Sequence, residues 1–171
     1  MKRIESERLH AAHAFDLTRG RFRRADGSEV ERDVVEHVGS VAIAAHDDEV
    51  VHLVRQPREA IEADGLLELP AGTIDEDESP LECARRELCE EVGLAAAEWE
   101  EMQVIYPTPG YSSEVQTLLR ATGLSECEAD PDEDEQIEVV RWPLAEIDRA
   151  VEELHDATTL VGLMLLQRRL S

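Results

Sequence analysis

The segment GTIDEDESPLECARRELCEEVGL (Gly72–Leu94) contains the signals for a helix start, an amphipathic helix and a helix stop. Ser79 can cap the N-terminus, the proline after it suits the first helical position, and Glu82 completes a Ser-x-x-Glu capping box. Gly93 suits the position just after the last turn. The pattern therefore predicts a helix over 79–92. Four apolar residues at helical spacing form one stripe on it: Leu81, Ala84, Leu88 and Val92.

Three acidic residues share one side of this helix. Glu87 and Glu91 are four residues apart, and Glu90 is three residues after Glu87. Two of them lie in the last turn, where the helix dipole is already negative, so each costs about 0.3–1 kcal/mol there. A bound divalent cation would reverse this cost, because carboxylate oxygens are the ligands that magnesium prefers. The alternative is a solvated acidic face, since glutamate is abundant in this chain.

Short apolar runs on both sides of the helix predict strands. Residues 39–46 and 50–54, separated by a turn at Asp47-Asp48, predict a hairpin. Residues 9–36 predict short strands with turns at Arg19-Gly20 and Asp26-Gly27. Mixed strands with two long helices indicate an α/β sandwich. Further strands are expected at 66–69, 103–106, 115–120 and 137–142, and a closing amphipathic helix at 157–170.

The charge of the chain excludes two classes of partner. Of its 171 residues, 40 are Asp or Glu and 17 are Lys or Arg, which gives a formal net charge of −23. A nucleic-acid binder needs a basic surface, and an anionic membrane would repel this one. The chain has no apolar run long enough to span a bilayer, and Met1–Glu5 lacks the apolar core of a signal peptide. We therefore expect a cytoplasmic protein.

The basic residues are almost all arginine, because Lys2 is the only lysine. An acid-rich surface with little lysine is one halophile-like composition, and GC-rich coding alone also replaces lysine by arginine. Composition leaves both explanations open.

The three cysteines are Cys83, Cys89 and Cys127. Their odd number and the absence of a Cys-x-x-Cys pair favour a reducing cytosol over a disulfide scaffold or a zinc site. Cys83 and Cys89 lie about 120° apart around the predicted helix, so they cannot bond to each other.

The segment Gly72–Leu94 fits the spacing G-x5-E-x7-R-E-U-x-E-E-x-G-U, where U is apolar. This is the Nudix box, and the chain resembles the Nudix hydrolase family from about residue 29 to its end. The resemblance implies an α/β/α sandwich with a mixed sheet, preceded by antiparallel N-terminal strands. It also implies hydrolysis of a nucleoside diphosphate linked to another group, with Mg²⁺ or Mn²⁺ as the cofactor. Arg86 and Glu90, four residues apart, can pair along the helix and hold the carboxylate in place.

Features outside the box resemble the ADP-ribose pyrophosphatase subfamily. ELPAG (68–72) is similar to its E-x-P-A-G pattern, which implies that the Ala71 carbonyl is a metal ligand and places Glu68 at the substrate. VRQPR (54–58) and ERDVVEH (31–37) are similar to two stretches whose arginines contact substrate, here Arg58 and Arg32. PGYSSE (109–114) resembles a loop near the terminal ribose, with Pro109 as the mark of ADP-ribose specificity and Glu114 as a contact.

The acid-rich stretch 126–138 contains DEDEQI (132–137), which resembles a loop that folds over the site in the subfamily. The resemblance implies that Glu133 deprotonates the attacking water and that Glu135 is a metal ligand. Glu90 is the competing base, as in other Nudix subfamilies. A solvated acidic loop is the alternative. The implied metal ligands are Ala71, Glu87, Glu91 and Glu135.

We expect a Nudix domain over 39–171 and an N-terminal strand region over 1–38. By resemblance, the N-terminal region contacts substrate and pairs two copies into a homodimer. The predicted reaction converts ADP-ribose and water to AMP and ribose 5-phosphate. Since only 4% of residues are aromatic, too few for a clear adenine clamp, another nucleoside diphosphate sugar is the alternative substrate. A ligand-binding regulator without turnover is disfavoured, because the box is intact and no length remains for a DNA-binding domain.

Overall fold

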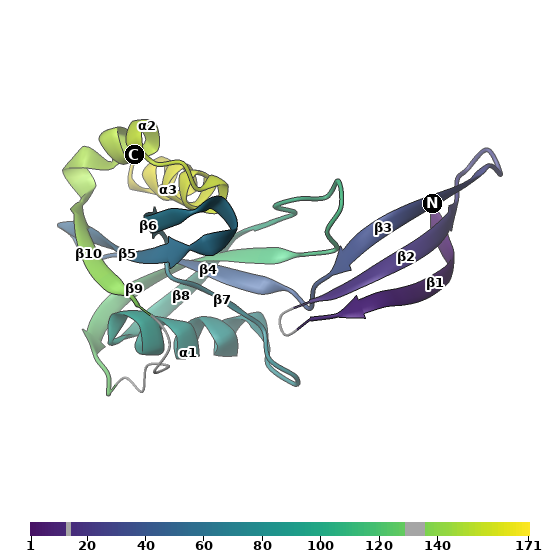
Figure 1. Ribbon diagram of the computed structural model, residues 1–171. Helices are drawn as coiled ribbons and strands as arrows, with labels where there is room; N and C mark the ends of the chain where they lie inside the picture. Colours follow the sequence, from purple (N-terminus) through teal and green to yellow (C-terminus); the bar gives the residue numbers. More distant parts are fainter. Residues whose placement is uncertain (13–14, 129–135) are drawn as a thin grey trace. The chain divides into compact units, whose positions relative to one another are not determined.

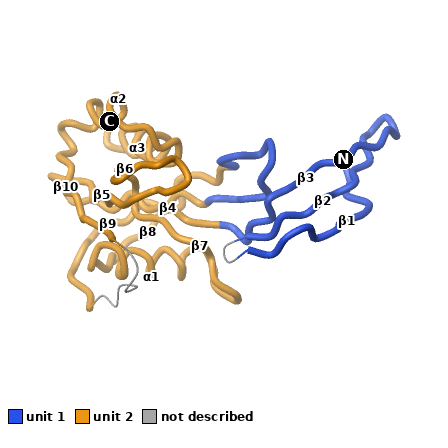
Figure 2. Tube along the Cα trace, in the orientation of Figure 1, with its two compact units in different colours: residues 1–39, 106–116 blue, residues 40–105, 117–171 orange. Residues whose placement is uncertain are grey.

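The structure is a computed structural model that describes residues 1–12, 15–128 and 136–171. The chain divides into two compact units, which Figure 2 shows in blue and orange. The first unit comprises residues 1–39 and 106–116, and the second comprises residues 40–105 and 117–171.

The first unit is a three-stranded antiparallel sheet with the order β1-β2-β3. The segment 106–116 pairs with β3, where Val35 N donates to Tyr111 O at 2.8 Å and Ser113 N donates to Val35 O at 2.9 Å. The turn expected at Asp26-Gly27 is confirmed, and Gly27 has the positive φ of 83° that favours glycine. The strands are β1 (Lys2–Ala11), β2 (Asp16–Arg23) and β3 (Glu29–Glu36).

The turn expected at Arg19-Gly20 is wrong, because both residues lie inside β2. Gly20 has a packing role there. A Cβ atom at this position would lie 2.6 Å from the ring of Phe22, two residues along the same strand face. The glycine therefore makes room for an aromatic ring and does not reverse the chain.

The second unit contains a four-stranded sheet, β7-β4-β9-β8, and a three-stranded sheet, β10-β5-β6. Helix α1 covers one face of β4, and α3 covers the other (Figure 1). The expected sandwich of helices around a sheet, with antiparallel strands before it, is confirmed. The strands are β4 (Ser40–Ala45), β5 (Val50–Arg58), β6 (Ala63–Glu68), β7 (Ala71–Thr73), β8 (Leu94–Ile105), β9 (Gln116–Glu126) and β10 (Glu138–Pro143). The helices are α1 (Pro80–Val92), α2 (Ile147–Glu153) and α3 (Ala157–Leu170), with short 3-10 turns at Glu59–Ile61 and Leu144–Glu146.

The turn expected at Asp47-Asp48 is confirmed, and Asp47 N donates to Val50 O across it at 3.1 Å. The hairpin expected from residues 39–46 and 50–54 is wrong beyond this turn, because the pairing stops after one isolated bridge between His46 and Val51, and β4 and β5 belong to different sheets. All six residues of β4 are buried, and so are four consecutive residues of β5. A strand that is buried on both faces needs partners from distant segments, and the short turn between the two runs does not supply them.

The core consists of two clusters on opposite faces of β4. Val41 and Ile43 pack against Ala84 and Leu88 of α1. Ala42 and Ala44 lie in the other cluster, with residues of α2 and α3. Successive side chains along a strand point to opposite faces, so the sheet that contains β4 is the central layer of the sandwich. Of the helices in the described ranges, none combines the length and the apolar character that a membrane-spanning helix requires.

Helix α1 has the ends that its sequence predicts. Ser79 accepts a hydrogen bond from Glu82 N, and the Glu82 carboxylate accepts one from Ser79 N at 2.9 Å. Gly93 ends the helix with a φ of 73°, which favours glycine. These local contacts fix where the helix begins and ends, and so which side its glutamates occupy.

The expectation of reduced cysteines is wrong for two of the three. Cys89 of α1 and Cys127 form a disulfide, and Cys83 is a buried free thiol. Cys127 follows the end of β9, where its N–H donates to Gly93 O at 3.1 Å. The two cysteines are 38 positions apart in sequence, so only the fold brings them together.

The disulfide predicts a strong dependence of stability on reductant. Replacing Cys127 by serine should lower the free energy of unfolding by about 4 kcal/mol, because the bond closes a long loop in the unfolded chain. Urea denaturation of the oxidised proteins measures this loss. A reductant should lower the wild-type midpoint to that of Cys127→Ser and leave the variant unchanged. A wild-type midpoint that ignores the reductant would contradict the prediction.

Candidate active site

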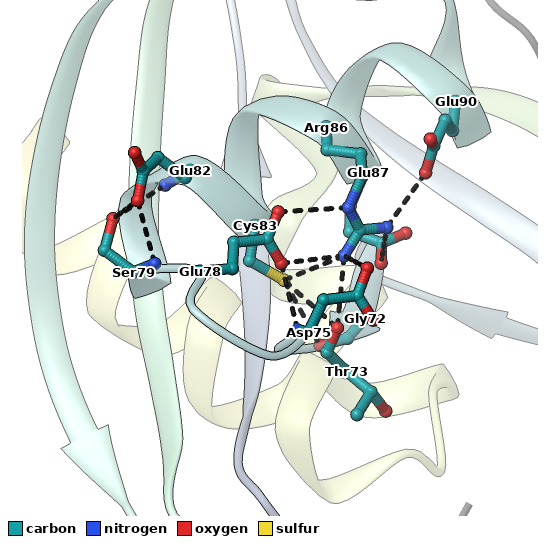
Figure 3. Close-up of polar contacts among 10 residues, drawn as sticks. All are labelled: Gly72, Thr73, Asp75, Glu78, Ser79, Glu82, Cys83, Arg86, Glu87 and Glu90. Atoms are coloured by element: carbon teal, nitrogen blue, oxygen red, sulfur yellow. Dashed lines mark hydrogen bonds and ion pairs between the residues drawn. The ribbon is translucent and has the colours of Figure 1, made fainter. Parts of the chain in front are cut away.

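Arg86 is the centre of a network of carboxylates on α1 and the loop before it (Figure 3). Its guanidinium binds Glu78 through two hydrogen bonds, Nε to Oε1 at 3.1 Å and Nη2 to Oε2 at 3.0 Å. Nη1 donates to Glu87 at 2.7 Å and to Glu90 at 3.0 Å. Nη2 also donates to the carbonyl oxygen of Thr73 at 3.1 Å. The expected pairing of Arg86 with Glu90 is therefore present, as one contact among several.

The contact between Arg86 and Glu78 shifts the pKa values of both residues. The hydrogen bond from Arg86 holds the pKa of Glu78 below its ordinary value. The same hydrogen bond is the main reason that the pKa of Arg86 rises above its ordinary value. Arg86 thus stays cationic and Glu78 anionic at neutral pH. Since its partners lie on α1 and on the preceding loop, this arginine ties the loop to the helix.

Gly72 is required by the position of Glu87. A Cβ atom on Gly72 would lie 1.8 Å from Glu87 Oε1 and 1.9 Å from Glu87 Cδ. The carboxylate therefore occupies the space that a side chain at residue 72 would take. This close approach is the physical reason for glycine at the first position of the segment.

Glu91, four residues after Glu87 on α1, also contacts β7. Its Oε2 accepts a hydrogen bond from Ala71 N at 2.9 Å, and the residue is 8% exposed. Glu87 and Glu91 thus contact two consecutive residues of β7, Gly72 and Ala71. Two carboxylates four residues apart on α1 are thereby held at the end of one strand.

The oxygen atoms where α1 meets β7 suit a hard divalent cation as ligands. Glu87, Glu91 and the carbonyl of Ala71 offer only oxygen atoms, which is the ligand type of magnesium and manganese. Among residues 1–12, 15–128 and 136–171, no three acidic, histidine or cysteine side chains already converge as a metal site. Glu87 and Glu90 both accept hydrogen bonds from Arg86. A cation would therefore compete with the guanidinium for their carboxylate oxygens.

A second ion pair lies at the end of β5 and β6. Arg58 binds Glu68 through Nε at 3.0 Å and Nη2 at 2.6 Å, and Gln56 donates to the same carboxylate at 3.0 Å. Glu68 is 7% exposed. The hydrogen bond to Glu68 raises the pKa of Arg58. The Arg58 side chain is 45% exposed. The structure therefore pairs two residues that the sequence assigned separately to substrate.

The remaining predicted residues lie elsewhere. Arg32 and Pro109 line one pocket within the first unit. Glu114 follows in the same loop, where its N–H donates to Ser112 Oγ at 3.1 Å. Glu133 and Glu135 lie outside the described residues.

Sequence reasoning gave no role to Glu78, although it is part of the spacing pattern. The structure makes it the bidentate partner of Arg86. Cys83 was also unassigned, and it lies within this network. Burial, chiefly, raises the pKa of its thiol to about 12, so it stays protonated and is a poor nucleophile.

Comparison with known proteins agrees with this geometry. A model of the NUDIX domain matches residues 36–160. The ADP-ribose pyrophosphatase of Mycobacterium tuberculosis (strain ATCC 25618 / H37Rv) is 40% identical over 152 residues, covering 86% of this chain and 73% of that protein. The ADP-ribose pyrophosphatase of Bacillus subtilis (strain 168) is 33% identical over 171 residues, covering 97% and 92%. The crystal structure of an ADP compounds hydrolase matches with a TM-score of 0.85 and 26% identity, covering 99% of this chain and 93% of that one.

Proposed function

Because the chain belongs to the NUDIX domain family, we propose that it hydrolyses the diphosphate bond of ADP-ribose to AMP and ribose 5-phosphate. The observation that carries the proposal is the joint placement of Glu87 and Glu91 against Gly72 and Ala71. Relatives that are named ADP-ribose pyrophosphatase cover most of the chain and support this substrate.

The reaction adds water across the diphosphate. The water oxygen bonds to one phosphorus, the bond from that phosphorus to the bridging oxygen breaks, and the bridging oxygen leaves with the other phosphate. Nudix hydrolases generally use divalent metal ions, and we propose Mg²⁺ held by Glu87, Glu91, the Ala71 carbonyl and Glu135. A bound cation offsets the charge of the diphosphate in this acidic protein. Arg86 orients the glutamates, and Arg58 and Arg32 offer charge-assisted hydrogen bonds to the substrate.

We assign the general base to Glu133 and keep Glu90 as its competitor. Glu90 accepts a hydrogen bond from Arg86 at 3.0 Å, which occupies one of its oxygens. That contact suits a carboxylate that is held in place, whereas a base must reach the attacking water. The assignment of Glu133 rests on the DEDEQI resemblance (132–137).

Replacing Glu91 by glutamine should weaken the apparent affinity for magnesium by more than about 10–100-fold, the usual cost of losing even an outer contact of a metal site. The amide keeps the size of the side chain and an oxygen for Ala71 N, so the fold should be retained. Titrating magnesium in the hydrolysis assay measures the shift, and excess metal should restore part of the activity.

Glu76→Gln is the matched control, because Glu76 is exposed in the loop before α1. It should titrate with magnesium as the wild type does. An unchanged magnesium requirement in Glu91→Gln would remove Glu91 from the proposed metal site.

A substrate panel tests the choice of ADP-ribose. We expect ADP-ribose to give the highest kcat/KM among ADP-ribose, ADP-glucose, diadenosine polyphosphate, NADH and a nucleoside triphosphate. The expectation rests on Pro109 and on the named relatives. Diadenosine polyphosphate cleaved about ten times better would overturn the reading of Pro109, since tenfold corresponds to about 1.4 kcal/mol of transition-state discrimination.

We also propose that residues 1–38 pair two copies of the chain into a homodimer, as the resemblance implies. Light scattering of the intact chain at several concentrations measures the mass, and a monomer throughout would contradict this proposal.

A further inference from the structure

The connection between β6 and β7 passes from one sheet of the second unit to the other. β6 ends at Glu68 in the three-stranded sheet, and β7 begins at Ala71 in the four-stranded sheet. The two residues between them, Leu69 and Pro70, are buried. Because proline has no N–H, the connection has one backbone donor, Leu69 N. A buried donor needs an acceptor, which must come from another element.

Helix α3 supplies this acceptor. Thr159 Oγ1 accepts a hydrogen bond from Leu69 N at 2.8 Å, and Thr159 is 0% exposed. The backbone N–H of Thr159 donates to the side chain of Asp156, the N-cap residue of α3, at 2.7 Å. The cap therefore fixes the turn that carries the hydroxyl. A hydroxyl buried in an apolar core is costly unless it is hydrogen-bonded, so the contact with Leu69 accounts for threonine at this position.

Gly162 of α3 contacts the same leucine. A Cβ atom on Gly162 would lie 2.3 Å from Leu69 Cδ1. Since Leu69 is 1% exposed, its side chain has little space to move aside. Residues three positions apart lie on one side of a helix, so Thr159 and Gly162 face Leu69 together. Helix α3 thus holds both the backbone and the side chain of this residue.

The connection leads directly into the candidate metal site. Pro70 O accepts a hydrogen bond from Ile43 N of β4 at 2.8 Å. Ala71 N, the next donor along the chain, binds Glu91 Oε2 at 2.9 Å. Three consecutive residues are therefore tied to three different elements: Leu69 to α3, Pro70 to β4 and Ala71 to α1.

The residue before the connection belongs to the candidate site as well. Glu68, which directly precedes Leu69, accepts a hydrogen bond from Arg58 Nη2 at 2.6 Å. The arginine proposed for substrate and the carbonyl of Ala71, proposed for the metal, thus depend on backbone on either side of one buried leucine. A shift of Leu69 would move both.

We propose that Thr159 and Gly162 are positioning residues for the hydrolysis site. They hold Leu69, and through it the backbone of Ala71, so that the Ala71 carbonyl and the Glu91 carboxylate keep their relative position. The inference rests on the proposed function, because that function gives these two groups their role as metal ligands. It adds α3 to a site that is otherwise built from α1, β6 and β7.

Amide hydrogen exchange of Ala71 in the metal-free protein, followed by NMR, tests the positioning directly. Thr159→Val keeps the size of the side chain but leaves Leu69 N buried without an acceptor. The Ala71 amide should then exchange at least about tenfold faster than in the wild type. Thr159→Ser keeps the hydroxyl and should exchange close to the wild-type rate. Gly162→Ala should also speed the exchange, because its methyl group displaces Leu69 while the hydroxyl stays.

Leu166→Val is the matched control for a general loss of stability. Leu166 is a buried residue of α3 in the same core cluster, seven positions beyond Thr159. This variant should speed the exchange of Ala71 no more than that of Leu118, a buried residue of β9. An equal increase at Ala71 and Leu118 in Thr159→Val would overturn the positioning role, and so would a serine variant that exchanges as fast as the valine variant.

Binding of Mn²⁺ alone, measured from the free-ion signal in electron paramagnetic resonance, tests the consequence for the metal. Thr159→Val should raise the Kd for Mn²⁺ by about 10-fold, the lower end of the cost of losing an outer contact of a metal site. Thr159→Ser and Leu166→Val should bind Mn²⁺ as the wild type does.

A wild-type Kd in Thr159→Val, together with faster exchange of its Ala71 amide, would overturn the link from α3 to the metal. A wild-type protein that binds no Mn²⁺ would overturn the metal site of the proposed function and this link with it. The exchange of Ala71 needs neither metal nor substrate, so it still decides whether α3 positions this backbone.

Discussion

Replacing Glu133 by glutamine is expected to lower kcat by about 10²–10⁴-fold, the range for loss of a general base. Glutamine keeps the size of the side chain but cannot take a proton from water. Because the loss falls on proton transfer, excess magnesium should not restore the activity. Hydrolysis of ADP-ribose at saturating substrate and magnesium measures it.

Glu90→Gln is the matched comparison, because it removes the competing carboxylate by the same chemical change. Its loss should be milder, since Glu90 is held by Arg86 at 3.0 Å and serves to position its neighbours. If Glu133→Gln retains more than about a third of the wild-type kcat while Glu90→Gln is nearly inactive, the base lies on α1. The stretch 126–138 would then be a solvated acidic loop.

The second large effect is expected at Gly72. Changing it to alanine should lower kcat/KM for ADP-ribose by about 100-fold or more, because the new Cβ displaces the Glu87 carboxylate from β7. The magnesium requirement should rise at the same time. Steady-state kinetics over a range of magnesium concentrations measures both changes.

Gly65→Ala controls for the general cost of adding a methyl group to a glycine. Its Cβ would lie 3.2 Å from the flexible Arg55 side chain, which can move aside. Activity close to that of the wild type is expected for this control. Full activity in Gly72→Ala would show that hydrolysis does not depend on the position of the Glu87 carboxylate against β7.

Local patterns predicted helix α1 well. The limits of α1 follow from the Ser79–Glu82 capping box and from Gly93, and each of these signals acts within a few residues. Glu87, Glu90 and Glu91 share a side for the same reason, since helical spacing alone sets it. The sequence therefore predicted the element that carries most of the candidate site.

Features that depend on distant contacts were not predicted. The partners of β4 and β5 are set by burial of both strand faces, and a turn between two apolar runs does not encode them. The Cys89–Cys127 bond joins positions that only the folded β9 brings to the end of α1. The bidentate contact of Glu78 with Arg86 depends on how the loop before α1 folds back onto it.

Product analysis after incubation of the intact chain with ADP-ribose and magnesium tests whether the chain hydrolyses the diphosphate bond of ADP-ribose. We expect AMP and ribose 5-phosphate in equal amounts, with no products when a chelator removes the metal. Intact ADP-ribose at the end of the incubation, or release of free ADP or adenosine in place of AMP, would contradict it.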